Sequence, residues 1–203
     1  MQQLLSSIVY EPDLNDRWSF IWGNDIYSSR KVYTMAFSSI PAPNTFFWVW
    51  KSQCAARIKV FAWLMFVDRL NTRSMLQRWN FNLQSGHNCV LCQLGAEEDI
   101  THLLFACPFA VRCWYKLNIV WDLSLEIHTR IILAKNLSPH SFFMEIFLVA
   151  AWEIWKLRNA TIFEGARPSF HLWTVRFREK MQLQLHCFKH DTKILVRNWL
   201  ASF

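Results

Sequence analysis

Four residues in the middle of the chain have the types and the spacing of metal ligands. Cys89 and Cys92 form a C-x2-C pair, and nine residues separate it from the H-x4-C pair of His102 and Cys107. Thiolate and imidazole groups are the ligands that tetrahedral zinc prefers, and a C-x2-C pair can hold one ion from a single tight turn. The alternative interpretation is that these are scattered cysteines of an aromatic-rich core. We favour a zinc site because the spacing follows known zinc ligand patterns.

Three cysteines and one histidine fill all four positions of a tetrahedral site. Since no position is left for water or substrate, the pattern predicts a structural Zn²⁺ rather than a catalytic one. We expect the H-x4-C pair to close the site from about one helical turn. His87 and Cys113 are further candidate ligands, although Cys113 lies in an apolar run that is typical of a buried thiol.

The segments around these ligands resemble the zinc-binding domain that follows the reverse transcriptase in plant non-LTR (LINE-type) retrotransposons. The resemblance covers about residues 17–163 and rests on several motifs in order: DRWSFIWGNDIYSSRKVYTMAF, FFWVWKSQCAARIKVFAWLMFVDRLNTRSMLQRW, HLLFACPFAVRCW and WEIWKLRNATIF. Ala55 and Ala56 stand where this family usually has prolines, and Glu98-Asp99 stands where it usually has Glu-Thr. The resemblance implies a zinc-binding module that helps to hold template or target nucleic acid.

The composition favours a folded, helical protein. Hydrophobic residues make up 53% of the 203 residues and charged residues 18%, which excludes a disordered chain and favours a sizeable core. Only four glycines and six prolines punctuate the sequence, fewer than a many-stranded sandwich with its frequent turns would need.

Targeting and membrane signals are not found. The N-terminal segment MQQLLSSIVYEPDLND lacks the basic and apolar regions of a secretory signal. The most apolar stretch, 142–155, contains Glu145 and Glu153 and is too short and too charged to span a bilayer. We therefore expect an intracellular protein, nuclear or cytoplasmic and not secreted, with no membrane partner. A reducing compartment also suits zinc thiolates better than disulfides.

We predict a mainly α fold in three parts. Residues 1–16 form a loosely ordered lead-in, residues 17–122 a reverse-transcriptase-type zinc-binding domain, and residues 123–203 a C-terminal helical region. The zinc-binding domain is expected to begin with a short β-hairpin over Trp18–Tyr27, turning at Gly23–Asp25, and to continue as a helical zinc-knuckle module. The C-terminal region is expected to be a helical pair.

Periodicity and capping residues define the predicted helices. The clearest apolar face has spacings of three and four and consists of Ile58, Phe61, Ala62, Met65 and Phe66. Thr72 is a candidate cap for the helix that follows it, and either Asp99 or Thr101 is a candidate start for the helix that contains His102. Other helices are predicted over 29–37, 46–51, 108–119, 129–135 and 141–163. A last long helix is predicted from Pro168, with the apolar stripe Trp173, Phe177, Met181, Leu185 and Phe188.

The charge pattern indicates a polyanionic partner. The formal net charge is +7, and residues 51–78 contain six basic residues against one acid, Asp68. Lysine and arginine contacts to phosphates provide affinity without sequence information, so RNA or DNA is the expected partner. The candidate nucleic-acid contacts are Arg57, Lys59, Arg69, Arg73, Arg78 and Trp79. For each basic residue the alternative is an ordinary solvated helix face, and for Trp79 it is core packing.

No motif predicts catalysis or a small-molecule substrate. The sequence contains no P-loop, no G-x-S-x-G and no H-E-x-x-H. We therefore interpret the chain as a zinc-stabilised nucleic-acid-binding module of retrotransposon origin that is not an enzyme. The alternative function is a protein-interaction or scaffold module, with the twelve tryptophans supplying an aromatic surface for a protein partner.

Overall fold

The computed structural model describes residues 19–24, 26–37, 42–81 and 86–203. The chain divides into two compact units, 1–42 and 43–203. The described residues are mainly helical, as predicted, and their β structure is limited to one isolated bridge between Asn88 and Glu97. The boundaries placed at residues 16 and 122 remain predictions. No helix of the described segments has the length and apolar character needed to cross a membrane.

The first unit contains the helix α2, Ser29–Phe37, at the position that the sequence predicted. The Ser28 hydroxyl accepts a hydrogen bond of 3.3 Å from the Lys31 N–H and so caps it. The predicted hairpin is not shown. A turn lies earlier than the predicted Gly23–Asp25, at residues 21–24, where the Gly23 N–H donates to the Phe20 carbonyl at 2.7 Å and Gly23 has a φ of 84°. The described residues 19–24 and 26–28 form no strand on either side of that turn, and Trp18 and Asp25 lie outside the described residues.

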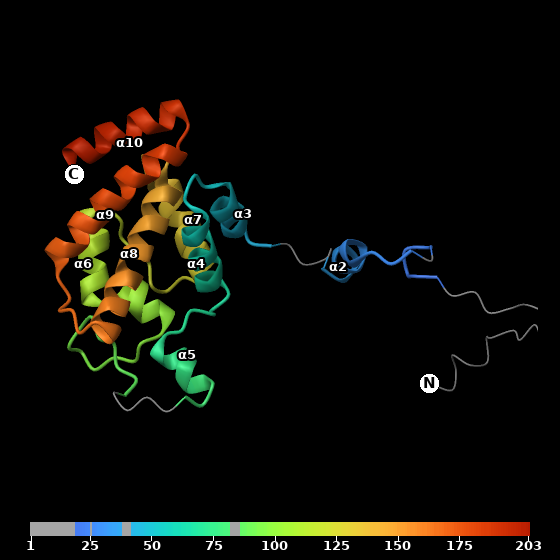
Figure 1. The fold of residues 1–203 in the computed structure, drawn as a ribbon, viewed down its shortest axis with the longest axis horizontal. Coiled ribbons are helices and arrows are strands. Elements are labelled where there is room, and N and C mark those ends of the chain that lie inside the picture. Colours follow the sequence, from blue (N-terminus) through green and yellow to red (C-terminus); the bar gives the residue numbers. More distant parts are fainter. Residues whose placement is uncertain (1–18, 25, 38–41, 82–85) are drawn as a thin grey trace, which may run out of the picture. The chain divides into compact units, whose positions relative to one another are not determined.

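The second unit is a helical body built around one long central helix (Figure 1). Its elements are α3 (Asn44–Lys51), α4 (Ala56–Phe66), α5 (Arg73–Arg78), the π-helical turn η1 (His102–Ala106), α6 (Pro108–Lys116), α7 (Ile127–Leu137), α8 (Phe143–Phe163), α9 (Phe170–Gln184), the 3₁₀ turn η2 (Leu185–Cys187) and α10 (His190–Ser202). Helix α8 packs against α4, α9 and α6, and it contacts η1 as well.

The central position of α8 follows from its sequence. Its first half is apolar on every side, so it can be stable only when neighbours cover it all round. The Phe147 ring belongs to this first half, with ring-centroid distances of 5.7 Å to Trp114, 5.6 Å to Trp121 and 6.4 Å to Phe105. These rings come from α6, the loop after it, and η1, so one side chain joins the metal-bearing part of the chain to α8.

The predicted helix before the metal-binding segment is confirmed. Every residue of its expected apolar face is buried in α4 (Ile58, Phe61, Ala62, Met65 and Phe66). Thr72 caps α5 as predicted, because its hydroxyl accepts a 3.2 Å hydrogen bond from the Met75 N–H.

The C-terminal region differs from the predicted helical pair. The expected last helix is divided into α9 and α10 by η2 and by the extended residues Phe188 and Lys189, so three long helices follow residue 140 instead of two. No glycine or proline marks the break in the sequence. A tertiary contact stabilises it: the Lys189 N–H donates to the Oε1 atom of Gln53. The predicted stripe from Trp173 to Phe188 is nevertheless buried.

The turn between α3 and α4 is held by two further side chains. The Gln53 N–H donates to Glu145 Oε1 at 2.8 Å, and the Ala55 N–H donates to Gln184 Oε1 at 2.7 Å. Since Glu145 lies on α8 and Gln184 on α9, these bonds fix the N-terminus of α4 against both helices.

We expect Phe147→Ala to lower the free energy of unfolding by about 3–5 kcal/mol, because it removes a fully buried ring that contacts four other aromatic rings. Phe163→Ala, at the exposed end of the same helix, is the matched control and should change it by less than about 0.5 kcal/mol. Urea denaturation followed by tryptophan fluorescence measures both, and equal losses would contradict the central role of Phe147.

Candidate metal centre

The four predicted ligands lie together in the structure. Their ligand atoms, the Sγ atoms of Cys89, Cys92 and Cys107 and a ring nitrogen of His102, are all within 4.8 Å of one another. Cys89 Sγ lies 3.9 Å from Cys107 Sγ, and Cys92 Sγ lies 3.4 Å from His102 Nε2. The other candidates, His87 and Cys113, do not belong to this cluster.

These separations fit a tetrahedral zinc ion. With Zn–S bonds of about 2.3 Å and Zn–N bonds of about 2.0–2.1 Å, tetrahedral angles place two sulfurs about 3.8 Å apart and a sulfur and a nitrogen about 3.6 Å apart. The distances of 3.9 and 3.4 Å agree with both values. Cys89, Cys92, His102 and Cys107 are thus positioned to bind one zinc ion, with no further protein group required.

The first pair of ligands lies on a short loop that folds back on itself. The Cys89 N–H donates to the Ala96 carbonyl at 2.8 Å, and the Glu98 N–H donates to the His87 carbonyl at 2.9 Å. Gly95, at a φ of 67°, allows the chain to reverse between them. Cys89 and Cys92 therefore project from the two ends of one tight turn, as a C-x2-C pair requires.

The second pair depends on a π-helical turn. Five residues of an α-helix advance about 1.4 turns, which would direct His102 and Cys107 to different sides. A π turn closes between residues i and i+5 and brings both to one side. The Cys107 N–H donates to the His102 carbonyl at 2.6 Å, and Asp99 Oδ1 accepts from the His102 N–H at 2.6 Å, which confirms Asp99 as the cap.

Hydrogen bonds change the acidity of two of the ligand thiols in opposite directions. The contact between the two thiols raises the pKa of Cys89 and lowers the pKa of Cys107, in each case as the largest effect. The Cys107 sulfur also accepts from the N–H groups of Phe109 and Ala110 in the first turn of α6, where the helix dipole favours a thiolate. Because ligand thiols must lose their protons, zinc binding should release protons here.

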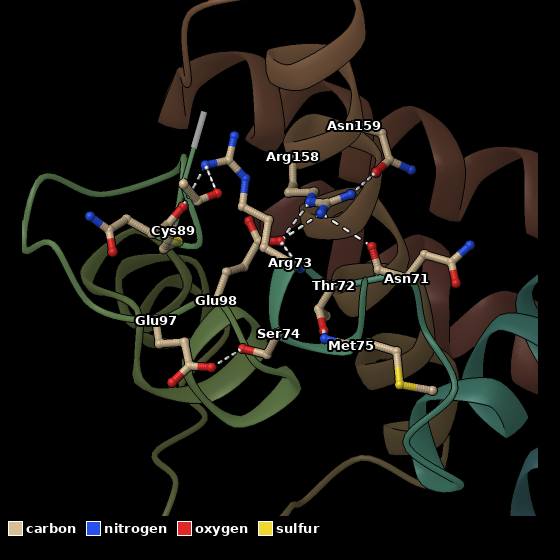
Figure 2. A network of polar contacts seen from close by, with 12 residues as sticks. Asn71, Thr72, Arg73, Ser74, Met75, Cys89, Glu97, Glu98, Arg158 and Asn159 are labelled. Atoms are coloured by element: carbon tan, nitrogen blue, oxygen red, sulfur yellow. Dashed lines mark hydrogen bonds and ion pairs between the residues drawn. The ribbon is translucent and has the colours of Figure 1, made fainter. Parts of the chain in front are cut away.

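A buried ion pair joins the metal-binding loop to the core (Figure 2). Arg158 Nη2 on α8 lies 2.6 Å from Glu98 Oε1, and the two side chains are 4% and 0% exposed. The same guanidinium donates from Nη2 to the Asn71 carbonyl at 3.2 Å and from Nη1 to Asn159 Oδ1 at 2.9 Å. Glu98 is the residue that follows the β-bridge, so this pair fixes the loop between the two ligand pairs.

The same network reaches α5. Glu98 Oε1 accepts from the Arg73 N–H at 3.1 Å, and the Glu98 carbonyl accepts from the Ser74 N–H at 3.1 Å. Arg73 Nη1 donates to the carbonyls of Gly86 and Asn88 at 3.2 and 3.0 Å. Figure 2 shows the Arg73 side chain directed at this backbone, where it holds the segment just before Cys89.

The structure separates the predicted nucleic-acid contacts into three groups. Arg73 is buried and engaged with the loop carbonyls. Arg69, Arg78 and Trp79 lie beyond the C-terminal end of α4 and are exposed. The last two, Arg57 and Lys59, lie at the N-terminal end of α4, and Lys59 Nζ donates to the Trp50 carbonyl at 2.9 Å.

Sequence reasoning did not identify the buried partners Glu98 and Arg158. Both lie in segments that the resemblance quotes, Glu98 between the ligand pairs and Arg158 in WEIWKLRNATIF. Their pairing could not be inferred because 60 residues separate them along the chain.

We expect the purified protein to contain one zinc ion per chain and Cys89→Ser/Cys92→Ser to contain almost none, because two of four ligands are then lost. Elemental analysis measures the ratio, and Cys113→Ser is the matched control, since that buried thiol lies outside the cluster. A ratio near zero for the unaltered protein, or an unchanged ratio for the double variant, would refute the site.

We expect Arg158→Met to destabilise the protein by about 3–5 kcal/mol, because it leaves the Glu98 carboxylate buried and unpaired. Arg78→Met removes an exposed pair with Asp68 and should cost less than about 1 kcal/mol. Denaturant titrations compare the two. The double variant Glu98→Gln/Arg158→Met should regain part of the loss, and a further loss would argue against the pairing.

Comparison with known proteins agrees with the metal site. Residues 27–114, which include all four ligands, match the family model described as zinc-binding in reverse transcriptase. A protein of Arabidopsis thaliana, provisionally named as a ribonuclease H protein, is 28% identical over 161 residues, which is 73% of this chain and 25% of that protein. The chain thus spans about a quarter of the length of this curated relative. No solved structure matches the present chain significantly. The resemblance to the zinc-binding domain of reverse transcriptases is confirmed for residues 27–114, the part of the chain that holds the metal cluster.

Proposed function

We propose that the chain is a zinc-stabilised module of retrotransposon origin that binds single-stranded RNA or DNA. The observation that carries the proposal is the attachment of α5 to the metal-binding loop. The α5 helix starts with hydrogen bonds to that loop and ends in exposed basic and aromatic residues. Zinc binding would therefore fix the position of a surface suited to nucleic acid.

The attachment consists of several bonds. The Ser74 N–H and hydroxyl donate to the Glu98 carbonyl at 3.1 Å and to Glu97 Oε1 at 2.7 Å. The other end of α5 bears Arg78 and Trp79, and Trp79 is 57% exposed. We define the metal-side surface as Arg69, Arg78, Trp79 and Phe81, all of which are exposed.

The charges of this surface are accessible to phosphate. Arg78 Nη2 lies 2.6 Å from Asp68 Oδ2, but both side chains are more than half exposed. Exposed ion pairs contribute about 0–1 kcal/mol, so a phosphate group can replace Asp68 at little cost. Arg69, next to Asp68 in the chain, supplies a second cation.

The aromatic residues indicate single-stranded rather than duplex nucleic acid. An exposed indole next to arginines can stack on an unpaired base while the arginines contact phosphates. Bases inside a duplex do not offer their faces in this way. RNA and DNA share these groups, so the proposal includes both.

We propose no catalytic role for the metal. The protein supplies all four ligand atoms, and a catalytic zinc needs an exchangeable position for water. Purified protein should show neither nuclease nor reverse transcriptase activity. Cleavage that copurifies with the protein and is abolished by His102→Ala would overturn this part of the proposal.

A second candidate function is protein interaction. Val120 and Leu137 are 79% and 76% exposed and line a hollow of about 240 Å³ at the start of α8, together with Ile119 and Phe143. An exposed apolar patch of this kind suits a protein partner. A chain that binds no nucleic acid would favour this function.

We expect the logarithm of the affinity for a single-stranded oligonucleotide to fall linearly with the logarithm of the salt concentration. The slope should be roughly −0.7 for each phosphate contacted. Arg69→Gln/Arg78→Gln should reduce the slope by about 1.4, because it removes two such contacts. Trp79→Ala should weaken binding by about 1–3 kcal/mol with an unchanged slope, because stacking is not ionic.

Fluorescence anisotropy at several salt concentrations measures these effects. The control Lys193→Gln/Arg197→Gln removes the same charge from α10, which lies at the opposite end of the second unit from α5 in Figure 1. Equal losses in the two double variants would contradict a localised surface and indicate attraction by net charge alone.

A further inference from the structure

A second group of cations lies away from the metal, where three helices meet. It consists of Arg57 on α4, Lys156 on α8, and Arg176 and Lys180 on α9, together with the carboxylate of Glu153 on α8. Arg176 and Lys180 are four residues apart and therefore share one face of α9. We call this group the three-helix basic cluster.

The members of the cluster are close enough to influence one another. Lys156 Nζ lies 3.7 Å from Glu153 Oε2. The Ala55 N–H donates to Gln184 Oε1 at 2.7 Å, which sets the start of α4, with Arg57, against the last turns of α9, with Lys180. The positive charges of Arg57 and Lys156 lower the pKa of Lys180, and that of Arg176 lowers the pKa of Glu153. Helix α8 packs against both α4 and α9, which is what brings these residues together.

Lys180 is the unusual member. The residue is only 8% exposed as a whole, but its Nζ atom still reaches solvent, and the ammonium forms no hydrogen bond or ion pair with the described residues. Partial burial, and then the nearby Arg57 guanidinium, lower the pKa of Lys180. An ammonium that reaches solvent without a protein partner can accept an anion as its partner.

The carboxylate of Glu153 offsets only part of this charge. The cluster contains one carboxylate and four cations, and the residue that bears the carboxylate, Glu153, is only 2% exposed. Its Oε2 atom lacks a hydrogen bond in the protein, and burial raises the pKa of Glu153. With four cations and one carboxylate, the cluster has an excess of positive charge around an ammonium that has no protein partner.

We propose that the three-helix basic cluster binds a phosphate group. Phosphate oxygens can accept from an ammonium and, in bidentate form, from guanidinium groups, so Lys180, Arg176 and Arg57 would supply donors of both kinds. The inference deepens the proposed function by assigning it a backbone contact on α4, α8 and α9, remote in sequence from the metal-side surface. It also stands without that function, because a free phosphate carries the same chemistry.

The test uses inorganic phosphate as the probe. Thermal unfolding of the zinc-loaded chain is measured in sodium phosphate and in sodium chloride at equal ionic strength and pH. The unaltered protein should unfold at a higher temperature in phosphate, because a ligand that binds the folded state stabilises it. Lys180→Met should unfold at about the wild-type temperature in chloride, since the Lys180 ammonium has no protein partner to lose, and it should lose the response to phosphate.

Direct titration gives the size of the effect. Lys180→Met should weaken phosphate binding roughly ten- to a hundredfold, the value of one charge-assisted hydrogen bond. Arg176→Met is a second variant in case Lys180→Met does not fold. Lys193→Met and Arg178→Met are the matched controls, since each removes one cation of the same type from α10 or from α9 outside the cluster.

An oligonucleotide arm distinguishes the source of the phosphate. If Lys180→Met weakens both inorganic phosphate and a single-stranded oligonucleotide, the group bound is a backbone phosphate. If it weakens inorganic phosphate alone, the site takes a free phosphate and the proposed function is unaffected. Wild-type protein that is no more stable in phosphate than in chloride, or control variants that lose as much affinity as Lys180→Met, would overturn the inference. If Arg69→Gln/Arg78→Gln and Trp79→Ala leave oligonucleotide binding unchanged while phosphate still stabilises the protein, only the proposed function is rejected.

Discussion

The buried ion pair between Glu98 and Arg158 is the interaction on which the arrangement of the second unit depends. It joins the loop between the two ligand pairs to the central helix α8 at a distance of 2.6 Å, with both side chains almost fully buried. Such a pair contributes little net stability while intact, but loss of one partner leaves a charge that the interior cannot solvate. The loop therefore cannot leave α8 without a large cost, and the same carboxylate oxygen also holds the start of α5 through the Arg73 N–H.

The metal and the ion pair constrain the same loop from two sides. The metal can join Cys89 and Cys92 to His102 and Cys107, which organises a short stretch of chain. The ion pair and the Phe147 aromatic cluster then connect that stretch to α8. Because α5 is bonded to the loop rather than to the metal ligands, a zinc ion would influence the exposed residues at its end only through the loop. A zinc ion bound here would act as a structural element, and its effect on the surface would be indirect.

Local patterns predicted the elements and the ligands, and long-range contacts account for what they missed. The spacing of Cys89, Cys92, His102 and Cys107 is a local signal, and so are the apolar face of α4 and the Thr72 cap, all of which the structure confirms. The break between α9 and α10 is stabilised by Gln53, more than 130 residues earlier in the chain, and no glycine or proline near the break predicts it. Arg73 looked like a solvent-facing cation in the sequence because its neighbours are basic, yet its side chain donates to loop carbonyls. Sequence composition cannot distinguish a cation that faces solvent from one that holds a loop.

Two cations on the helices of the second unit, Arg158 and Lys180, illustrate that distinction. Arg158 has partners for its Nε, Nη1 and Nη2 atoms and lies 4.8 Å from the Trp155 ring, so its burial is fully explained by the structure it supports. The Lys180 side chain is mostly covered, but its Nζ atom still reaches solvent, the described residues offer it no hydrogen bond, and Arg57, Lys156 and Arg176 lie on the same three helices. A structural role would be served as well by methionine, which fills the same space. A solvent-accessible ammonium that no protein group partners, among further cations, is placed to bind an anion, which makes the charge of Lys180, unlike that of Arg158, an argument for a ligand.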